Sequence, residues 1–364
     1  MKINLNKNGS AEPRISTFMP ASAHVRSKKS ATKRIGIAAI AATLAHALPL
    51  GGLGLLLASC SDSTQNSAHT SAATHDKLPV SASFYPIAWL TEQIGGDTVS
   101  VSSITPANVE PHDFELAPKD VNQLSQAKLV FYVAGFQASV DDAVATISGP
   151  NIVNLADSVS LEQATVDDGH HHSSDDDDHE HADHDHADHD HAALGLDPHF
   201  WLDPDRMEGA AEAIAEALGK ADPAHKDQFQ SNLTTVTNKL DELEHSYETG
   251  LAQCTRTSVV TSHAAFGYLT KHFGLEQHSI SGIDPEAEPS PADLASVKKI
   301  VQETGTTTIF TEELVSPKTA EALATETGAT TAVLSPVESK PSTGDYISAM
   351  QKNLTALRTA LECK

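Results

Sequence analysis

The chain has 364 residues and a formal net charge of −25 at pH 7. Its first 59 residues carry eight Lys or Arg against one acidic residue, so the remaining residues carry a net charge of −32 (−25 minus +7). An acidic body of this kind argues against nucleic acid as a partner and favours the attraction of cations.

The N-terminal segment has the pattern of an export signal. A basic region precedes an apolar run at 35–57, and His46 and Pro49 interrupt that run, which is typical of a secretory signal rather than of a permanent transmembrane helix. The run ends in Leu-Ala-Ser-Cys60, which resembles a bacterial lipobox, in which the cysteine becomes the lipidated first residue. We therefore expect a signal peptide at 1–59, a flexible tether at 60–77, and a protein anchored by acyl chains on the outer face of the cell membrane. The alternative is an ordinary signal peptide with a chance cysteine.

The residues after the tether alternate between strand-like and helical patterns. Strands are expected at 80–84, 98–104, 128–133 and 151–155, and helices at 87–94, from Asp120 over a short stretch, and at 138–147.

An acidic, histidine-rich segment at 167–191 follows. It holds eleven acidic residues and no Lys or Arg, so we expect a mobile loop that cannot form a core. Imidazole and carboxylate groups are ligands for divalent metals. We predict auxiliary metal binding by its nine histidines: His170, His171, His172, His179, His181, His184, His186, His189 and His191. The alternative is a solvated acidic linker.

A helix is expected at 205–218, and a long helix from Pro223 to about Ala252. One apolar stripe runs along the long helix at intervals of three and four residues: Leu233, Val236, Leu240, Leu243, Tyr247 and Leu251. The alternation then resumes, with strands at 258–262, 276–281, 307–311 and 331–335, and helices at 264–272, 291–303, 317–327 and 345–361.

This order predicts an α/β protein with two lobes, each a parallel sheet flanked by helices, joined by one long rigid helix. We place the N-terminal lobe at 78–219, the linking helix at 220–254 and the C-terminal lobe at 255–364. Cys254 and Cys363 form an even pair in an exported chain, so a disulfide is expected, and two free thiols are the alternative.

Four metal-capable residues are candidates for a binding site. Ligands of open parallel sheets bind beyond the carboxyl ends of the strands. His112 and His263 come after expected strands, His199 follows the histidine-rich segment, and Glu338 follows the strand at 331–335. Two come from each lobe, so all four are expected in one cleft between the lobes. Three imidazoles and a carboxylate make a closed tetrahedral site that suits zinc.

Six motifs, in this order, resemble a known family: PANVEPHDFELAPKDVNQLSQAKLVFYVAGF, DPHFWLDP, VVTSHAAFGYL, GIDPEAEPSPADL, IFTEELVSPKTAEALA and LSPVES. They are similar to the zinc-receptor lipoproteins of ABC importers, the cluster A-I solute-binding proteins of the ZnuA and AdcA kind. The resemblance implies two lobes, one zinc in the cleft, and delivery of that zinc to permease and ATPase subunits.

The resemblance also implies ligands at His112, His199 and His263. Some members have an aspartate where this chain has Ser335, and others use the glutamate that matches Glu338. Because serine is a poor zinc ligand, we expect Glu338 in the fourth position, with a water as the alternative. Zinc members of the family have a histidine at the position of His263, whereas manganese members have a carboxylate there, so the resemblance implies zinc.

Other residues near these motifs have two readings. Glu312 and Glu313 either support the site or form an acidic pair at a helix N-terminus. Glu110 is an alternative ligand that the following proline directs away. His272 and His278 are expected to be structural. An apolar wall around the metal is expected from four aromatic residues: Phe200, Trp201, Phe266 and Tyr268.

The predicted function is an extracytoplasmic zinc receptor that acts as a monomer, with Zn²⁺ as its cargo. A zinc hydrolase is disfavoured because the chain has no His-Glu-x-x-His and because four protein ligands leave no place for a catalytic water. Two further hypotheses stay open: a metal-binding surface adhesin, and a zinc buffer or chaperone that works through the histidine-rich segment.

Overall fold

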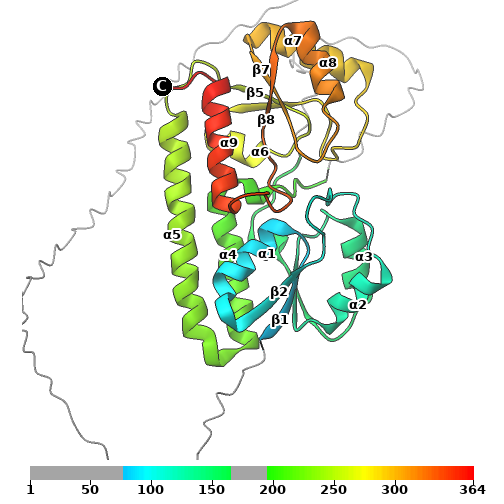
Figure 1. Ribbon diagram of the computed structural model, residues 1–364, viewed down its shortest axis with the longest axis vertical. Helices are drawn as coiled ribbons and strands as arrows, with labels where there is room; N and C mark the ends of the chain where they lie inside the picture. Colours follow the sequence, from blue (N-terminus) through cyan, green and yellow to red (C-terminus); the bar gives the residue numbers. More distant parts are fainter. Residues whose placement is uncertain (1–76, 165–194) are drawn as a thin grey trace, which may run out of the picture. The chain divides into compact units, whose positions relative to one another are not determined.

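The computed structural model describes residues 77–164 and 195–364 (Figure 1). The predicted signal peptide, Cys60, the tether and the segment at 167–191 lie outside the described residues. Among the described residues, none of the helices combines the length and the apolar character that crossing a bilayer requires. The first half contains β1 (Leu78–Ala82), α1 (Tyr85–Gly95), β2 (Val99–Ser103), α2 (Pro118–Gln126), β3 (Leu129–Tyr132), α3 (Ala138–Thr146) and β4 (Asn151–Asn154).

A pair of long helices follows, and then the second half. The pair is α4 (Pro204–Ala221) and α5 (Lys226–Leu251), preceded by the short 3-10 helix η3 (Phe200–Leu202). The second half contains β5 (Ser258–Thr261), α6 (Gly267–His272), β6 (Glu276–Ser279), α7 (Pro291–Thr304), β7 (Thr308–Thr311), α8 (Lys318–Thr327), β8 (Thr330–Val333) and α9 (Tyr346–Ala360).

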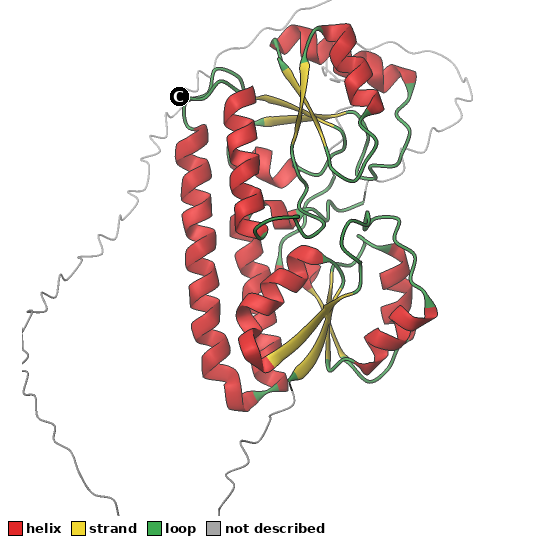
Figure 2. Ribbon diagram, in the orientation of Figure 1, coloured by secondary structure: helices red, strands yellow, loops and turns green. Residues whose placement is uncertain are grey.

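Each half is built on a four-stranded parallel sheet with helices on both faces (Figure 2). The strand order is β2-β1-β3-β4 in the N-terminal lobe and β6-β5-β7-β8 in the C-terminal lobe, and every pairing is parallel. Central strands such as β3, with Leu129, Val130 and Phe131 buried, are apolar on both faces, as a covered parallel sheet requires. The predicted fold class is therefore confirmed.

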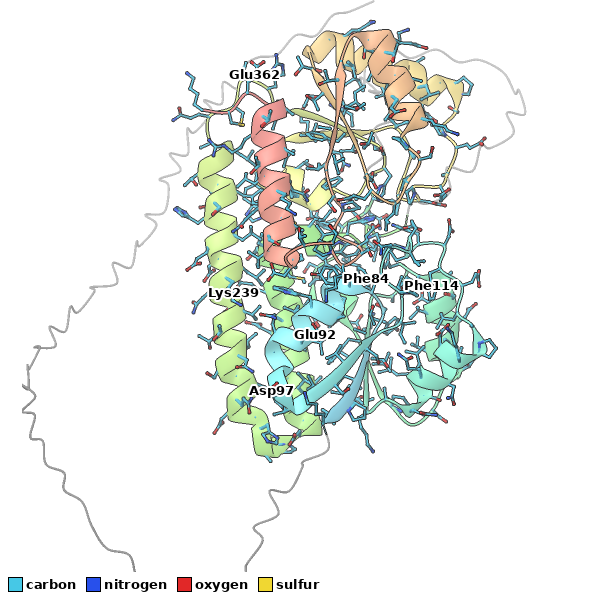
Figure 3. All side chains as sticks on the ribbon, in the orientation of Figure 1. Phe84, Glu92, Asp97, Phe114, Lys239 and Glu362 are labelled. Carbon is cyan, nitrogen blue, oxygen red and sulfur yellow. A yellow bond between two sulfur atoms is a disulfide. The ribbon has the colours of Figure 1, made fainter. Side chains whose placement is uncertain are left out.

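Helix α5 packs against both lobes through the apolar stripe that was identified in the sequence. It packs against α1 and α4 of the N-terminal lobe and against α9 of the C-terminal lobe. The side chains between these helices belong to one buried core that continues from Phe84, just before α1, to Phe310 in β7. Figure 3 draws the side chains of the described residues, with Phe84 labelled at the start of α1. Smaller cores lie under α2 and α3 and under α7 and α8. The two lobes therefore share a packed interior along α5.

Two helices begin three residues later than expected. The long helix was expected from Pro223, but Pro223–His225 forms a 3-10 turn and α5 begins at Lys226, because His225 departs from α-helical geometry (φ −108°, ψ 11°). Helix α6 was expected from Ala264 but begins at Gly267, because the Ala264 N–H donates to Gly282 O and continues the sheet edge instead.

The predicted disulfide between Cys254 and Cys363 is present. It joins the segment that follows α5 to the end of α9. The two helices that run side by side in Figure 1 are thus linked covalently at one end.

Candidate metal centre

The four predicted residues meet in space although they are far apart in the chain. His112 lies between β2 and α2, His199 lies just before η3, His263 follows β5, and Glu338 lies between β8 and α9. One potential ligand atom from each residue lies within 4.8 Å of the others. His112 Nε2 and His199 Nε2 are 3.2 Å apart. Glu338 Oε1 lies 3.5 Å, 3.6 Å and 3.9 Å from the Nε2 atoms of His112, His199 and His263.

These spacings fit a tetrahedral zinc ion. With bonds of about 2.0–2.1 Å, neighbouring ligand atoms around the ion are roughly 3.3 Å apart. Two of the four potential ligand atoms, His263 Nε2 and Glu338 Oε1, are buried without a hydrogen-bond partner among the described residues. Buried polar atoms are normally paired, and a cation between them would supply the missing interaction.

The cluster is shielded from water. His199 and His263 are fully buried, Glu338 is 4% exposed, and the His112 side chain is 8% exposed. The Trp201 ring lies 5.0 Å from the His199 ring. The predicted aromatic wall is therefore partly present, and exclusion of water strengthens electrostatic attraction between a cation and its ligands.

Two carboxylates hold the far nitrogens of two of the histidines. His199 Nδ1 is 2.8 Å from Asp197 Oδ1, and His263 Nδ1 is 2.7 Å from Glu312 Oε2. Each carboxylate also accepts the backbone N–H of the same histidine. A carboxylate at Nδ1 fixes the ring orientation and leaves the Nε2 lone pair for a metal.

The cluster is charged even without a metal. Burial alone would lower the pKa of His199, but Asp197 and Glu338 outweigh burial and raise it to about 9. Burial lowers the pKa of His112. Burial would raise the pKa of Glu338, but the surrounding histidines hold it well below its usual value. The metal-free cluster therefore pairs a carboxylate with a protonated His199, whose proton a metal must displace.

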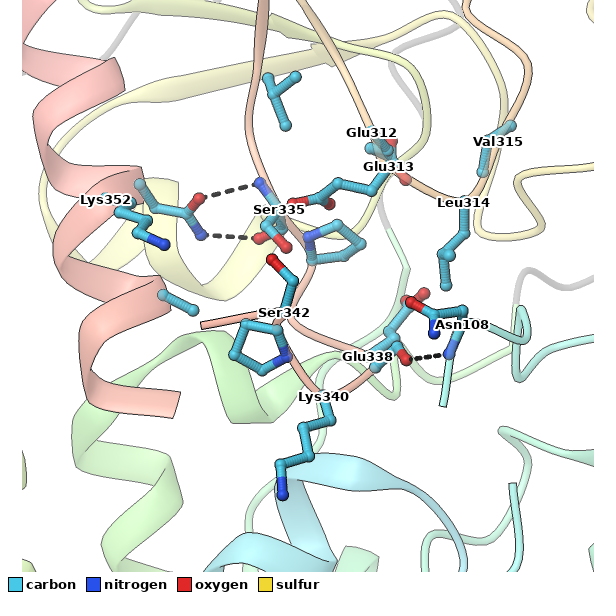
Figure 4. A pocket seen from close by; sticks show the side chains of 16 residues that line it. Asn108, Glu312, Glu313, Leu314, Val315, Ser335, Glu338, Lys340, Ser342 and Lys352 are labelled. Atoms are coloured by element: carbon cyan, nitrogen blue, oxygen red, sulfur yellow. Dashed lines mark hydrogen bonds between the residues drawn. The ribbon is translucent and has the colours of Figure 1, made fainter. Parts of the chain in front are cut away.

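The loop that carries Glu338 is attached to α9 by two hydrogen bonds. Asn353 of α9 accepts the Ser335 N–H at 2.9 Å and donates to Ser335 O at 2.7 Å. Figure 4 shows both bonds beside a cavity of about 330 Å³, with Glu338 on its wall. Ser335 Oγ accepts the Val337 N–H, so the serine shapes the loop while the glutamate reaches the cluster.

Two hydrogen bonds join the lobes close to the cluster. The Asn108 N–H, four residues before His112, donates to Ser339 Oγ at 2.7 Å. The Trp201 Nε1–H donates to Pro336 O at 2.8 Å. Both bonds end within two residues of Glu338, so the ligand loops of the two lobes hold each other in place.

Three further residues from the sequence analysis, Glu312, Glu110 and His272, can now be assigned a role. Glu312 supports His263, and the alternative of an acidic pair at a helix N-terminus is wrong because α8 begins only at Lys318. Glu110 accepts the N–H groups of His112 and Asp113, and burial raises its pKa to about 7. His272 is structural, with Nδ1 2.8 Å from Asp203 Oδ1.

Sequence reasoning missed two residues of the site. Asp197 was read only as part of the DPHFWLDP motif, although its position two residues before His199 allows its carboxylate to turn back to that ring. Phe136 was not considered, yet its ring lies 4.6 Å from the His112 ring. Tyr268 was assigned to the wall, but its hydroxyl is a hydrogen-bonding group that donates to Asp197 O at 2.7 Å.

The comparisons with known proteins agree with this geometry. Residues 80–360 match the family model for the zinc-uptake complex component A, periplasmic (ZnuA). The zinc-binding protein AdcA of Streptococcus pyogenes is 37% identical over 289 residues, which cover 78% of this chain and 56% of that protein. The high-affinity zinc uptake system protein ZnuA of Bacillus subtilis is 34% identical over 318 residues, which cover 85% of this chain and 95% of that protein.

A solved structure shares the fold. The laminin-binding protein Lmb of Streptococcus agalactiae, described as bifunctional with adhesin and metal-transporting activity, superposes with a TM-score of 0.67 at 32% identity. The match covers 78% of this chain and 99% of that one. The chain thus spans the whole of some relatives and only 56% of the length of AdcA. Because the family model covers most of the chain and both sheets, the protein belongs to the family of the periplasmic component A of zinc-uptake complexes.

Proposed function

We propose that this protein is an extracytoplasmic receptor that captures one Zn²⁺ at the four-residue cluster and delivers it to an ABC-type importer. The observation that carries the proposal is the buried meeting of three imidazole nitrogens and one carboxylate oxygen from both lobes. The donor set and its spacing suit zinc. His112, His199, His263 and Glu338 are the ligands in this proposal.

The cluster is suited to holding zinc rather than to catalysis. A catalytic zinc keeps one position open for water or substrate, whereas four protein ligands close a tetrahedral site. The family is one of solute-binding transport proteins. We therefore infer a non-enzymatic role, with the permease and ATPase subunits of an importer as the partners.

The place of action in this proposal is the outer face of the cell membrane. The basic leader, the apolar run and the lipobox ending at Cys60 support export and lipid anchoring. Metabolic labelling with a palmitate analogue tests this: the wild-type chain is expected to take up the label, and Cys60→Ala is expected to lose it and to be released from the membrane.

The histidine-rich segment has a supporting role in this proposal. The described residues that flank it are joined, since the Ala164 N–H donates to Gly195 O and Gln163 pairs with Leu196. The described flanks, Ala164 and Gly195, therefore lie close to Asp197, two residues before His199. Zinc held there weakly would raise the local concentration of the ion near the cluster.

Uptake of radioactive zinc by zinc-depleted cells tests the receptor role. Cells whose chromosomal copy carries Glu338→Ala are expected to lose most high-affinity uptake, while cells with His245→Ala keep it. His245 is the control because its side chain is exposed on α5, where it pairs with Glu248. Normal uptake by the Glu338→Ala cells at equal protein level would contradict the proposal.

An adhesin role is the second candidate, favoured by the similarity to Lmb. Binding of the purified chain to immobilised laminin distinguishes it. The receptor role alone predicts no saturable binding, whereas saturable binding that persists in Glu338→Ala would establish adhesion as a separate activity.

A further inference from the structure

Helix α6 of the C-terminal lobe contacts the N-terminal lobe through Tyr268, Lys271 and His272. Tyr268 is the one that reaches the segment before His199. The hydroxyl of Tyr268 donates to Asp197 O at 2.7 Å and accepts the Glu162 N–H at 2.8 Å. Both partners belong to the described segments that flank 165–194. They are also bonded to each other, because the Asp197 N–H donates to Glu162 O at 2.9 Å. One phenol oxygen thus joins two backbone segments.

Charged side chains hold the Tyr268 ring in place. The guanidinium of Arg206 lies 4.3 Å from the centre of the ring, a cation–π contact. Arg206 is also paired with Glu162 at 2.6 Å, and Lys271 of α6 pairs with the same carboxylate. The ring is therefore fixed from α4 and from α6 together.

Asp197 is the next member of this chain of contacts. Its Oδ1 accepts the His199 N–H at 2.9 Å and lies 2.8 Å from His199 Nδ1. Its Oδ2 lies against α6, where a Cβ added at Gly267 would stand only 3.0 Å from it. The absence of a side chain at Gly267 therefore lets α6 approach the carboxylate closely.

We propose that Tyr268 is a positioning residue for zinc, which locks the Asp197 segment against α6 and thereby fixes the orientation of the His199 ring from the opposite lobe. This inference rests on the proposed function. Tyr268 touches no ligand atom of the cluster, and it acts through Asp197. The hydroxyl is suited to the task because it can donate to Asp197 O and accept from Glu162 N–H at the same time.

Loss of the Tyr268 hydroxyl is expected to change the rate of zinc release more than the rate of zinc binding. A loosened His199 still meets an incoming zinc, but the ring leaves the ion more readily. Changing a group that orients a metal-ligating histidine typically weakens metal affinity about 10–100-fold. Because Tyr268 acts one step farther from the metal, we expect an effect near the lower end of that range, roughly tenfold.

Tyr268→Phe in the full chain tests the proposal, because it removes only the hydroxyl and keeps the ring under Arg206. The matched control is Tyr247→Phe, which removes an equally buried hydroxyl that donates to Met350 O at 2.7 Å between α5 and α9. The rate of zinc release is measured by transfer to excess chelator from protein loaded with one equivalent of zinc. The Co²⁺-loaded forms are compared by their visible spectra, which report ligand geometry.

Tyr268→Phe is expected to raise the rate of zinc release about tenfold, to leave the association rate unchanged, and to alter the Co²⁺ spectrum, while Tyr247→Phe changes none of these. A release rate equal to that of the wild type overturns the proposal. So does an equal rise in both variants, since that reflects general destabilisation. His263→Ala distinguishes failure of this inference from failure of the proposed receptor function. If His263→Ala releases zinc at the rate of the wild type, the proposed receptor function is wrong.

Discussion

Asp197 and Glu312 occupy equivalent positions at two of the histidines, one in each lobe. Each accepts the backbone N–H of its histidine and faces the Nδ1 atom of the same ring. At the residue scale, the proposed zinc site therefore predicts that its affinity depends on these two carboxylates as well as on the four ligands.

Asp197→Asn is expected to weaken zinc binding about 10–100-fold, because an amide orients the ring less firmly and removes the negative charge beside it. Competition with a chelator of known affinity measures the change. Asp222→Asn is the control, since Asp222 pairs with His225 between α4 and α5, away from the cluster. Equal affinities of the wild type and Asp197→Asn would show that the carboxylate is dispensable.

The raised pKa of His199 predicts proton release on zinc binding. At pH 7 a group with a pKa of about 9 is protonated, so zinc displaces one proton from His199, and apparent affinity rises with pH until about 9. Calorimetry at pH 7 in buffers of different ionisation enthalpy measures the proton. A binding enthalpy that is the same in all buffers would contradict this account.

The raised pKa of His199 also makes the stability of the metal-free protein depend on pH. The folded pKa of His199 lies above the unfolded value of 6.5, so its contribution to stability is fully present below pH 6.5 and is lost as the pH rises through about 9. The melting temperature of the metal-free protein is therefore expected to fall across this window.

The four residues of the cluster were predictable from the sequence, and the residues that hydrogen-bond to them were not. His112, His263 and Glu338 follow strands of parallel sheets, and topology brings such positions together. The choice of Glu338 over Ser335 followed from ligand chemistry and agrees with the cluster. The roles of Asp197 and Tyr268 depend on side-chain direction and on contacts between lobes, which no local pattern encodes.

At the element scale, the sequence predicted the strands and helices of the described residues, and the errors lie at their ends. Two helices begin three residues later than expected, and the strand expected at 80–84 is β1 at Leu78–Ala82. Periodicity identifies the body of a helix, whereas its first turn depends on local hydrogen bonds. Ala264 continues the sheet edge through Gly282, and His225 leaves α-helical geometry just before α5. Neither competing interaction is visible in the hydrophobic pattern.

The disulfide gives a prediction about elements. Cys254 and Cys363 are 109 positions apart, so the bond restricts a large loop of the unfolded chain. Replacing both with serine is expected to lower the free energy of unfolding by about 2–5 kcal/mol. Zinc affinity is expected to stay unchanged, because the disulfide and the cluster lie at opposite ends of α9. Urea denaturation and zinc titration of the same variant measure both, and a large loss of affinity would contradict the separation.

At the scale of the whole molecule, one core runs through both lobes along α5, α4 and α9. A shared core limits independent movement of the lobes, as the predicted rigid helix implies. The ligand loops are further joined by the Asn108–Ser339 and Trp201–Pro336 bonds. The site is thus preorganised between two lobes that are already packed together.

A competitive zinc titration of the chain lacking 167–191 tests the central claim most directly. The deletion is practicable because Ala164 and Gly195 are hydrogen-bonded neighbours that a short linker can join. The titration is run with and without His263→Ala, and with His245→Ala as the control. We predict one tight site that survives the deletion and His245→Ala and collapses with His263→Ala. Loss of tight binding on deletion alone would mean that the histidine-rich segment holds the metal and that the four-residue cluster is not the receptor site.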